Sequence, residues 1–369
     1  MNFKFDQDQE MMRDSAKRLL ADLSPLSAVH KILDSDTLSY DEKLWQQMAE
    51  SGWQGTAIPE EFGGSGLGYL ELAVLAEEMG HALACVPFGS SIYLAAEAIM
   101  AAGSDQQKRT HLPKIASGET IATYAYAEKG RIDPDGVQVK ASGGKLTGVK
   151  SPVADGLSAH LAIVSARDEQ GAVSLYLVDL NGPGVQRERV NSMDRTRKQA
   201  RLRFDGAPAE LLGQAGSGAR IQEQVFDRAA ALFAFEQVGG AQAALDMGTA
   251  YAKERYAFGR PIGSFQAVKH RLADMFIKIE LARSNAYYAA WALSSAQDKL
   301  PLAAAYARVL AVDAYAFAAQ ENVQVHGGIG FTWEADPHLY MKRCKHLESL
   351  LGGNLVWRGK LMRQIEQAA

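Results

Sequence analysis

The feature that most constrains the fold is a series of three long, Ala- and Leu-rich segments with a helical period in the last part of the chain. They cover residues 219–254, 264–296 and 301–325. Ala and Leu are strong helix formers, and helices of this length must pack together to bury their apolar faces. The C-terminal part of the chain is therefore predicted to form a helical bundle.

The first third of the chain also carries apolar residues at helical spacing, for example at Leu75 and Met79. Asp6 followed by Gln9 has the pattern of a capping box, which predicts that the first helix begins there. The main interruption is the segment 58–68, whose four glycines and one proline predict a loop.

The middle of the chain has a different pattern of short alternating or β-branched runs separated by Gly-rich turns. Residues 161–165 and 173–180 are two such runs, and they predict a small antiparallel β domain. We therefore expect an α+β fold with an N-terminal helical domain (1–117), a β-barrel-like domain (118–212) and a C-terminal helical bundle (213–369).

Composition excludes several classes of protein. With 369 residues, 47% of them hydrophobic, the chain predicts two or three packed domains. The net charge of −4 and the scattered Lys and Arg residues argue against a nucleic-acid partner. Cys85 and Cys344 are too few for a disulfide framework, and the eight histidines lack metal-ligand spacing. The sequence shows neither a leader segment nor a membrane span, so a cytoplasmic protein is expected.

Two strings carry the most specific information. The first runs from Tyr251 to Met275 and contains Arg255-Tyr-Ala-Phe-Gly-Arg-Pro261. The second is Gln324-Val-His-Gly-Gly-Ile-Gly-Phe-Thr-Trp-Glu334. Both resemble the corresponding strings of acyl-CoA dehydrogenases, which use FAD to desaturate the α,β bond of CoA thioesters. Segments 45–53, 58–68 and 77–80 resemble the N-terminal domain of the same family.

The resemblance implies that the C-terminal part of the chain binds FAD. By this likeness Arg255 reaches a flavin pyrophosphate held mainly by a neighbouring subunit, and Phe258 and Gln266 line the cofactor. Gln324 with the Gly327-Gly328 pair would approach the adenosine half. Both assignments have an alternative. Arg255 could simply favour the negative end of its helix, because a cation suits the last turn. The Gly327-Gly328 pair could simply be a helix C-cap, which is a common role of glycine.

In the β domain, two segments resemble the strands that the family lays against the flavin ring. The residues concerned here are Tyr126, Ala127, Val153 and Ala154. The family usually has Thr or Ser where this chain has Ala127 and Ala154, so only backbone contacts are expected. The Gly-rich, Ser-containing stretch that normally follows is replaced by residues 129–134, which puts the usual acyl-CoA contacts in doubt.

Desaturation needs a carboxylate that removes the α-proton. The two positions that supply it in the family correspond to Ala229 and Leu351 in this chain, and neither side chain accepts a proton. Glu236 lies seven residues after Ala229, on nearly the same face of the helix, and is the predicted substitute, with Asp227 second. The alternative is that Glu236 pairs with a basic side chain inside the bundle.

Three functions are therefore open. In the first, the chain is an acyl-CoA dehydrogenase that uses Glu236 as its base. It would act on a bulky or steroid side-chain CoA thioester and pass electrons to an electron-transferring flavoprotein. Alternatively it is a non-catalytic subunit of a heteromeric acyl-CoA dehydrogenase that completes the FAD site without supplying the base. A weaker third reading is a flavin oxidase or monooxygenase. A homo- or hetero-oligomer, dimer or tetramer, is expected in the first two cases.

Overall fold

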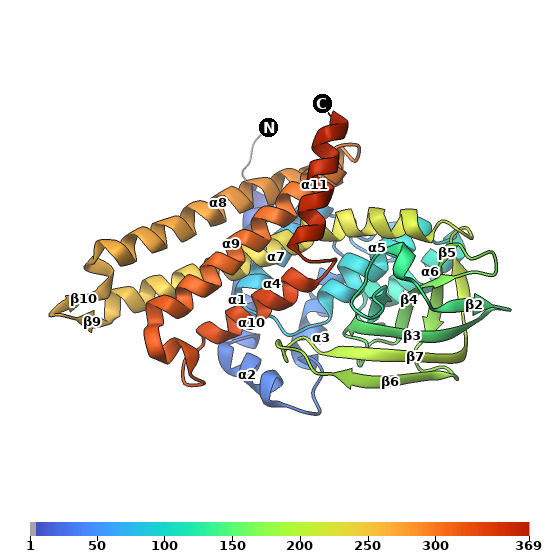
Figure 1. Ribbon diagram of the computed structural model, residues 1–369, viewed down its shortest axis with the longest axis horizontal. Coiled ribbons are helices and arrows are strands. Elements are labelled where there is room, and N and C mark those ends of the chain that lie inside the picture. The colour runs from blue at the N-terminus through green and yellow to red at the C-terminus, as the bar shows by residue number, and fades with distance from the viewer. Residues whose placement is uncertain (1–4, 369) are drawn as a thin grey trace. The chain divides into compact units, whose positions relative to one another are not determined.

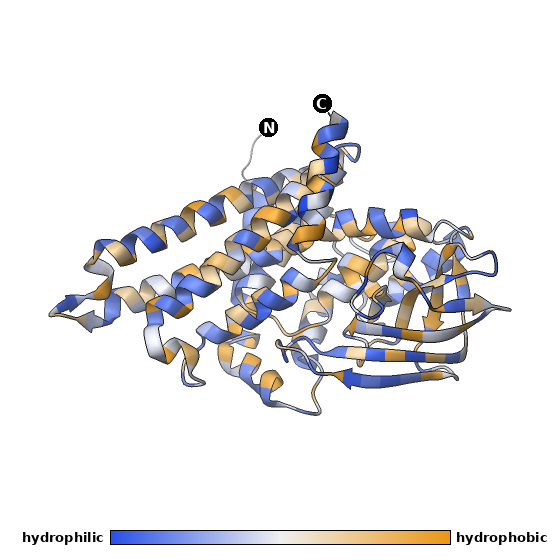
Figure 2. Cartoon of the chain, viewed as in Figure 1, coloured by the Kyte–Doolittle hydropathy of each residue, from blue (hydrophilic) through white to orange (hydrophobic). Residues whose placement is uncertain are grey.

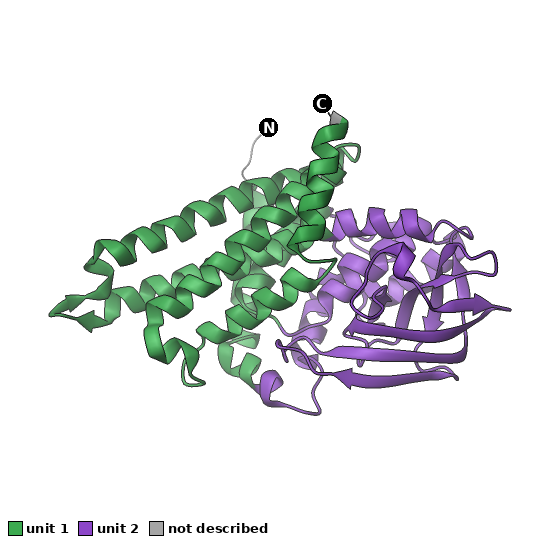
Figure 3. Cartoon of the chain, viewed as in Figure 1, with its two compact units in different colours: residues 1–30, 69–84, 230–369 green, residues 31–68, 85–229 purple. Residues whose placement is uncertain are grey.

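The computed structural model describes residues 5–368 and divides the chain into two compact units (Figure 3). The first unit takes residues 1–30, 69–84 and 230–369, and the second takes residues 31–68 and 85–229. Helix α7 (Gly218–Glu254) contributes to both units, because the boundary falls after residue 229.

The first unit is built almost entirely of helices (Figure 1). Besides the later part of α7, its elements are α1 (Gln7–Leu23), the start of α2 (Leu26–Asp34), α4 (Tyr69–His81), the hairpin β9 (Tyr256–Ala257) and β10 (Arg260–Pro261), α8 (Gln266–Ser295), α9 (Leu300–His326), α10 (Pro337–Ser349) and α11 (Asn354–Ala368). Short 3₁₀ turns at Ile262–Ser264 and Gly327–Phe331 join the hairpin to α8 and follow α9.

Local sequence accounts for the way these helices begin and pack. The side chain of Asp6 accepts a hydrogen bond from the backbone of Gln9, and Gln9 returns one to Asp6, so the predicted capping box is present. The predicted long helices 219–254, 264–296 and 301–325 are α7, α8 and α9. Their small residues permit close packing, as at Gly240, where an added Cβ would lie 2.4 Å from the ring of Tyr315.

Helix α9 with its following turn, Leu300–Phe331, is long and apolar enough to cross a membrane on length and composition alone. However, 67% of its most apolar window is buried within the protein. Its apolar character is therefore explained by packing inside the helical bundle, as in the core helix of a water-soluble protein.

The second unit combines short helices with the sheet. Its helical elements are the end of α2, α3 (Glu42–Glu50), the 3₁₀ turns Trp53–Gly55, Glu60–Phe62 and Pro134–Gly136, the π-helix Gly89–Ala96, α5 (Glu97–Ala102), α6 (Asp105–Ala116) and the start of α7. Its strands are β1 (Ala122–Ala125), β2 (Lys140–Ser142), β3 (Lys145–Ala154), β4 (Leu161–Arg167), β5 (Val173–Asp179), β6 (Val185–Val190), β7 (Gln199–Pro208) and β8 (Glu210–Leu212).

The eight strands form one sheet in the order β6-β7-β3-β2-β4-β5-β8, with β1 paired to β4. Most neighbours are antiparallel, as predicted, but β1 and β4 are parallel, and so are β2 and β4 at Lys140 and Arg167. The sheet is therefore mixed, with parallel pairing at these two places in an otherwise antiparallel domain. The edge strand β6 carries mainly polar residues (Figure 2), which blunts an open edge against unwanted pairing.

Secondary structure changes type close to the predicted domain boundaries. Helix α6 ends at Ala116 before β1, and α7 begins at Gly218 after β8. The fold class, helices followed by a sheet followed by helices, is confirmed. The two compact units group the chain in another way, so the three-domain division at 117 and 212 stays a prediction.

Candidate functional site

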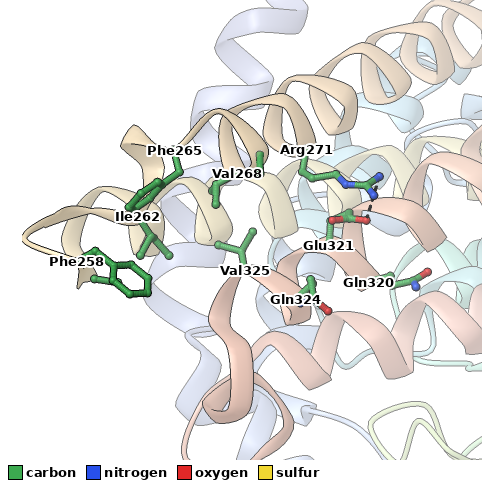
Figure 4. Close-up of a pocket in the computed structure, with 11 residues that line it drawn as sticks. Phe258, Ile262, Phe265, Val268, Arg271, Gln320, Glu321, Gln324 and Val325 are labelled. Atoms are coloured by element: carbon green, nitrogen blue, oxygen red, sulfur yellow. Dashed lines mark ion pairs between the residues drawn. The ribbon is translucent and has the colours of Figure 1, made fainter.

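A cleft of about 660 Å³ lies between the start of α8 and the end of α9 in the first unit (Figure 4). The β9–β10 hairpin and the turn after it complete its wall. The residues that line it are Ala257, Phe258, Ile262, Phe265, Ala267, Val268, Arg271, Gln320, Glu321, Gln324 and Val325.

The two ends of this cleft differ in chemistry. Phe258, Ile262 and Phe265 make one end apolar, whereas Arg271 and Glu321 form an ion pair at the other end (Figure 4). The cleft therefore suits an elongated ligand with both an apolar and a hydrogen-bonding part.

A second cavity of about 380 Å³ is lined by residues from the end of α7 and the turn after α9. It brings together Arg255, Gly327 and Gly328, three of the residues that the resemblance assigns to FAD. Arg255 directly follows the last residue of α7, and its backbone N–H donates to the carbonyl of Tyr251 over 2.8 Å. Its guanidinium is exposed and makes no ion pair with any carboxylate of residues 5–368, so it is available to an anion.

The Gly327-Gly328 pair presents bare backbone to this second cavity. A Cβ on either glycine would meet no atom within 4 Å, and Gly327 has φ +65°, a conformation that suits glycine. His326 just before it stacks on Tyr251 with ring centroids 4.1 Å apart, and its Nδ1 lies 2.8 Å from the carbonyl of Asn322. These contacts give His326 a structural role.

Large aromatic side chains near the two cavities are unusually exposed. Phe258 is 95% exposed and Tyr256 63% exposed on the β9–β10 hairpin. Phe331 and Trp333, after the glycine pair, are 86% and 66% exposed. Exposed apolar side chains that gather in this way mark a surface that a ligand or another chain covers.

The second unit holds the other predicted cofactor residues. The backbone N–H of Ser151 donates to the carbonyl of Ala127 over 2.9 Å, and the hydroxyl of Thr123 donates to the carbonyl of Ala154 over 2.7 Å. These bonds connect the two segments that the resemblance places against the flavin ring. Tyr126 and Val153 are buried, so these two residues offer a ligand mainly their backbone.

A buried ion pair lies directly beside these segments. Nζ of Lys150 is 2.7 Å from Oε1 of Glu128, and the two side chains are 0% and 6% exposed. Lys150 also donates to the hydroxyl of Ser165, and Glu128 accepts from the backbone N–H of Val139. Burial lowers the pKa of Lys150 to about 8, against the opposing effect of Glu128. The pair fixes the strand that carries Val153.

Residues 129–134 form a tight turn in place of an open Gly-rich loop. Lys129 and Gly130 have φ +51° and +78°, and Glu128 and Arg131 exchange both backbone hydrogen bonds over 2.9 Å. Arg131 then binds Asp133 in a bidentate ion pair, with Nη2 2.6 Å from Oδ1 and Nε 3.0 Å from Oδ2. The segment is closed on itself by its own hydrogen bonds.

Glu236 lies in the core of the first unit, and it does not line the cavities described above. Its side chain is 1% exposed, and its Oε1 lies 3.8 Å from Nη1 of Arg343, which is also 1% exposed. Arg343 donates to the backbone carbonyls of Leu83 and Ala84 as well. The predicted alternative, in which Glu236 pairs with a basic side chain of the bundle, describes this arrangement.

The two positions that the resemblance assigns to the family's base are both buried and apolar. Ala229 is 0% exposed on α7, and Leu351 is 1% exposed in the turn between α10 and α11. Leu351 has φ +56°, and its carbonyl accepts a hydrogen bond from the indole of Trp357 over 2.9 Å. Asp227, the second choice for a base, is buried as well.

The sequence predictions found part of the cleft. Phe258 and Gln324 line it, and Gln266 lies at the first residue of α8, next to the lining residue Ala267. Arg271 and Glu321 were missed. Glu321 lies one helical turn before Gln324 and thus on a similar face, a signal that was available once Gln324 had been named. Arg271 on α8 faces Glu321, and its place in the cleft could be recognised only from the packing of α8 on α9.

The open surfaces of the first unit suit a flavin dinucleotide. An unpaired guanidinium and bare glycine backbone offer partners to phosphate, and the cleft offers an apolar wall with polar groups at one end. Within residues 5–368, no group of three His, Cys, Asp or Glu side chains comes together in a way that could hold a metal ion. These surfaces suit a protein that binds a flavin dinucleotide.

Comparison with known proteins gives the family. Residues 6–119 match the acyl-CoA dehydrogenase N-terminal domain, and residues 216–366 match the acyl-CoA dehydrogenase C-terminal domain. The chain belongs to the acyl-CoA dehydrogenase family, whose members are FAD-dependent oxidoreductases acting on CH–CH bonds.

Several relatives are similar over nearly their whole length. Acyl-CoA dehydrogenase IpdE2 of Mycobacterium tuberculosis is 34% identical, over 94% of this chain and 93% of its own. A solved variant of the Tcur3481-Tcur3483 steroid acyl-CoA dehydrogenase is 32% identical with a TM-score of 0.88, covering 98% of both chains. The ChsE4-ChsE5 complex from Mycobacterium tuberculosis is 28% identical with a TM-score of 0.89, covering 99% of both chains.

Proposed function

We propose that this chain is a subunit of a heteromeric acyl-CoA dehydrogenase that completes an FAD site without supplying the catalytic base. The substrate of the assembly is a CoA thioester with a bulky acyl group, of the steroid side-chain kind. The assembly is cytoplasmic and passes its electrons to an electron-transferring flavoprotein.

The observation that carries this proposal is the pairing of Glu236 with Arg343. A base must come within hydrogen-bonding distance of the proton that it removes. Both of these side chains are 1% exposed inside the bundle, and Ala229 and Leu351 leave no carboxylate at the two usual positions. Separating a buried carboxylate from its cation costs about 3–5 kcal/mol, so Glu236 is a poor candidate for a mobile base.

The two groups of predicted cofactor residues differ in how well they suit FAD, which supports the same proposal. In the first unit, Arg255, Gly327 and Gly328 keep an open cation and open backbone. In the second unit, Ala127 and Ala154 lack side-chain hydroxyls. A chain that lends its C-terminal surface to a partner's cofactor needs the first group and not the second.

The turn at residues 129–134 is a further support. Its backbone groups at Glu128 and Arg131 are bonded to each other, and Arg131 is occupied by Asp133. The carbonyl of Ile132 also accepts a hydrogen bond from Gln222, so few backbone groups of this segment are left to bind an acyl-CoA thioester. We therefore assign acyl-CoA binding to the partner subunit.

The names of relatives agree with a two-chain assembly. The Tcur3481-Tcur3483 steroid acyl-CoA dehydrogenase and the ChsE4-ChsE5 complex are each named for two components. For this chain, a steroid-type substrate and a second subunit are part of the proposal.

Within the assembly the residues of this chain have binding roles. Arg255 donates to a pyrophosphate, the backbone of Gly327 and Gly328 approaches the nucleotide, and Phe258 covers an apolar face of the cofactor and excludes water. FAD, when bound, supplies the acceptor for the hydride that leaves the β-carbon of the thioester. A carboxylate of the partner removes the α-proton.

Co-expression tests the proposal directly. The chain is purified alone and together with the product of a neighbouring gene, and flavin absorbance and acyl-CoA-dependent bleaching under anaerobic conditions are measured. We expect little flavin in the chain alone, and bound flavin with bleaching in the complex. Bleaching by the chain alone would refute the proposal, and oxygen consumption would instead identify an oxidase.

A pair of variants separates the role of Glu236. In the complex, Glu236→Gln and the double variant Glu236→Gln/Arg343→Met should both keep bleaching, because neither residue touches substrate. The double variant is included since Glu236→Gln alone removes the negative charge beside the buried Arg343 guanidinium and lowers stability. Loss of bleaching in both variants, with unchanged flavin content, would establish Glu236 as the base.

A further inference from the structure

A cluster of three aromatic rings joins the first turns of α7 to β1 and the residues that follow it. The rings of Tyr126 and Phe226 lie 4.9 Å apart, centroid to centroid, at an angle of 73°. The ring of Tyr124 lies 5.6 Å from that of Tyr126 and 6.3 Å from that of Phe226. All three pairs have the edge-on geometry that aromatic rings prefer. The rings therefore pack as one cluster.

The cluster covers one face of α7. Gln222, Phe226 and Ala229 lie within an arc of about 60° on this helix, because they are spaced by four and three residues. A helical side chain leans toward the N-terminal end of its helix, so the methyl group of Ala229 points back toward the turn that carries Phe226. Ala229 is 0% exposed, whereas Tyr126 and Phe226 keep 9% and 8%. Solvent can therefore reach the edge of these two rings but not Ala229.

Gln222 fastens the turn at residues 129–134 to the same face of α7. Its Nε2 donates to the carbonyl of Ile132 over 2.8 Å, and its Oε1 accepts a hydrogen bond from the hydroxyl of Tyr124 over 3.4 Å. Gln222 is only 4% exposed, so both bonds are shielded from water. The turn, the rings and the start of α7 are thus held together.

The place of this cluster matters because of what desaturation requires. The Cα–Cβ bond of a thioester must lie between the flavin, which accepts the hydride, and the base, which accepts the proton. By the resemblance, Ala127 marks the flavin side and Ala229 marks one of the two base positions. Tyr126 directly precedes the first, and Phe226 lies one helical turn before the second. The two rings that touch therefore come from opposite sides of the space that a thioester would need.

We infer that Tyr126 and Phe226 form an aromatic plug that occupies the acyl-thioester space of this chain, with Gln222 holding the turn at 129–134 beside it. The plug excludes an acyl-CoA by its bulk, in addition to the lack of a base. This inference rests on the proposed function, in which the partner subunit binds the acyl-CoA. It adds that the space in this chain is filled, so Ala229→Glu alone would not create a second active site.

Thiol labelling tests whether the plug closes this space. Ala229→Cys places a thiol at the base position, and the full chain is treated with hexyl methanethiosulfonate, whose alkyl chain has the width of an acyl group. Cys85 and Cys344 are buried, so the native chain is the blank. Mass spectrometry follows the modification. We expect Ala229→Cys to be protected, and to react at least roughly 100-fold faster when Tyr126→Ala or Phe226→Ala removes a ring.

Controls distinguish an opened plug from a loosened fold. Phe204→Ala, combined with Ala229→Cys, removes a buried ring of β7 in the same unit, and labelling should stay slow. Circular dichroism establishes that each variant is folded, and two plug variants keep the test valid if one of them does not fold. Rapid labelling of Ala229→Cys with both rings present would overturn the inference. Equal labelling rates in the Phe204→Ala and plug variants would overturn it as well.

The failures of the two proposals can be told apart. Acyl-CoA-dependent bleaching by the chain alone requires an open acyl space, and it refutes both proposals. A chain that does not bleach alone, but whose Ala229→Cys variant reacts rapidly with the plug intact, refutes the inference alone.

Discussion

Gly80 of α4 faces the backbone carbonyl of Glu236 on α7 so closely that a Cβ on Gly80 would lie 1.9 Å from that oxygen. Gly239 makes the reciprocal approach, because its Cβ would lie 1.8 Å from the carbonyl of Glu77. The two helices thus touch through backbone. The side chain of Glu236 is enclosed at this crossing.

Replacing Gly80 tests this contact. Gly80→Ala forces the helices apart, and we expect a loss of about 1–3 kcal/mol or more in the free energy of unfolding. Urea denaturation measures it. Gly359→Ala is the matched control, because a Cβ there would make an ordinary 3.6 Å contact with Arg363. The control should gain up to about 1 kcal/mol from its higher helix propensity. Equal effects at both sites would contradict the close crossing.

Glu78, also on α4, predicts a pH dependence of stability. Burial raises the pKa of its carboxyl from 4.5 to about 6, and Glu77 adds to the rise. The folded state therefore binds more protons than the unfolded state between these values, so this contribution to stability is full below pH 4.5 and is lost as pH rises through about 6.

Removing the charge should flatten that dependence. Relative to the native chain, Glu78→Gln should gain up to about 2 kcal/mol between pH 4 and pH 7, the equivalent of a shift of about 1.5 pKa units. Chemical denaturation at several pH values checks it. The exposed Asp298→Asn should follow the native curve. A Glu78→Gln curve parallel to the native one would contradict the prediction.

The buried pair of Lys150 and Glu128 should be important for stability of the sheet. Lys150→Met leaves the Glu128 carboxylate buried without its cation, and we expect a loss of about 3–5 kcal/mol. Lys150→Met/Glu128→Leu removes both charges and should recover part of this loss. The exposed pair of Arg201 and Glu188 is the comparison, because its members are 55% and 62% exposed. Arg201→Met should cost at most about 1 kcal/mol.

Phe258 should matter to the assembly and not to the fold of the chain. Its side chain is 95% exposed, so Phe258→Ser should leave the thermal unfolding of the isolated chain unchanged. The same variant should lower the flavin content of the co-expressed complex, because the apolar end of the cleft loses its cover. Unchanged flavin content would mean that Phe258 covers neither cofactor nor partner.

The long helices were predictable because their determinants are local. Ala and Leu repeat at helical spacing through α7, α8 and α9, and Asp6 with Gln9 caps α1 by an interaction three residues apart. The parallel pairing of β1 with β4 was not predictable in this way. It joins Ala122 to Leu161 across a long stretch of chain, and the short, fully buried β1 has no alternation to fix its neighbour.

The residues of the candidate site also differ in whether a local sequence pattern could identify them. Arg255 and the Gly327-Gly328 pair were identified from two separate strings, each readable by itself, and the structure brings them to one cavity. Arg271 with Glu321, and Arg343 with Glu236, join helices distant in sequence. Which residues face each other there depends on helix packing, and no local pattern encodes it.

The exposed aromatic hairpin around Phe258 has a consequence for how the protein is made. In the proposed heteromeric assembly, a chain synthesised in excess of its partner would carry Phe258, Phe331 and Trp333 uncovered into the cell, where such surfaces aggregate or attract chaperones and proteases. Production of the two subunits should therefore be matched, as translation from one message would do. In that assembly, the surface proposed to complete the FAD site would also make an orphan chain short-lived.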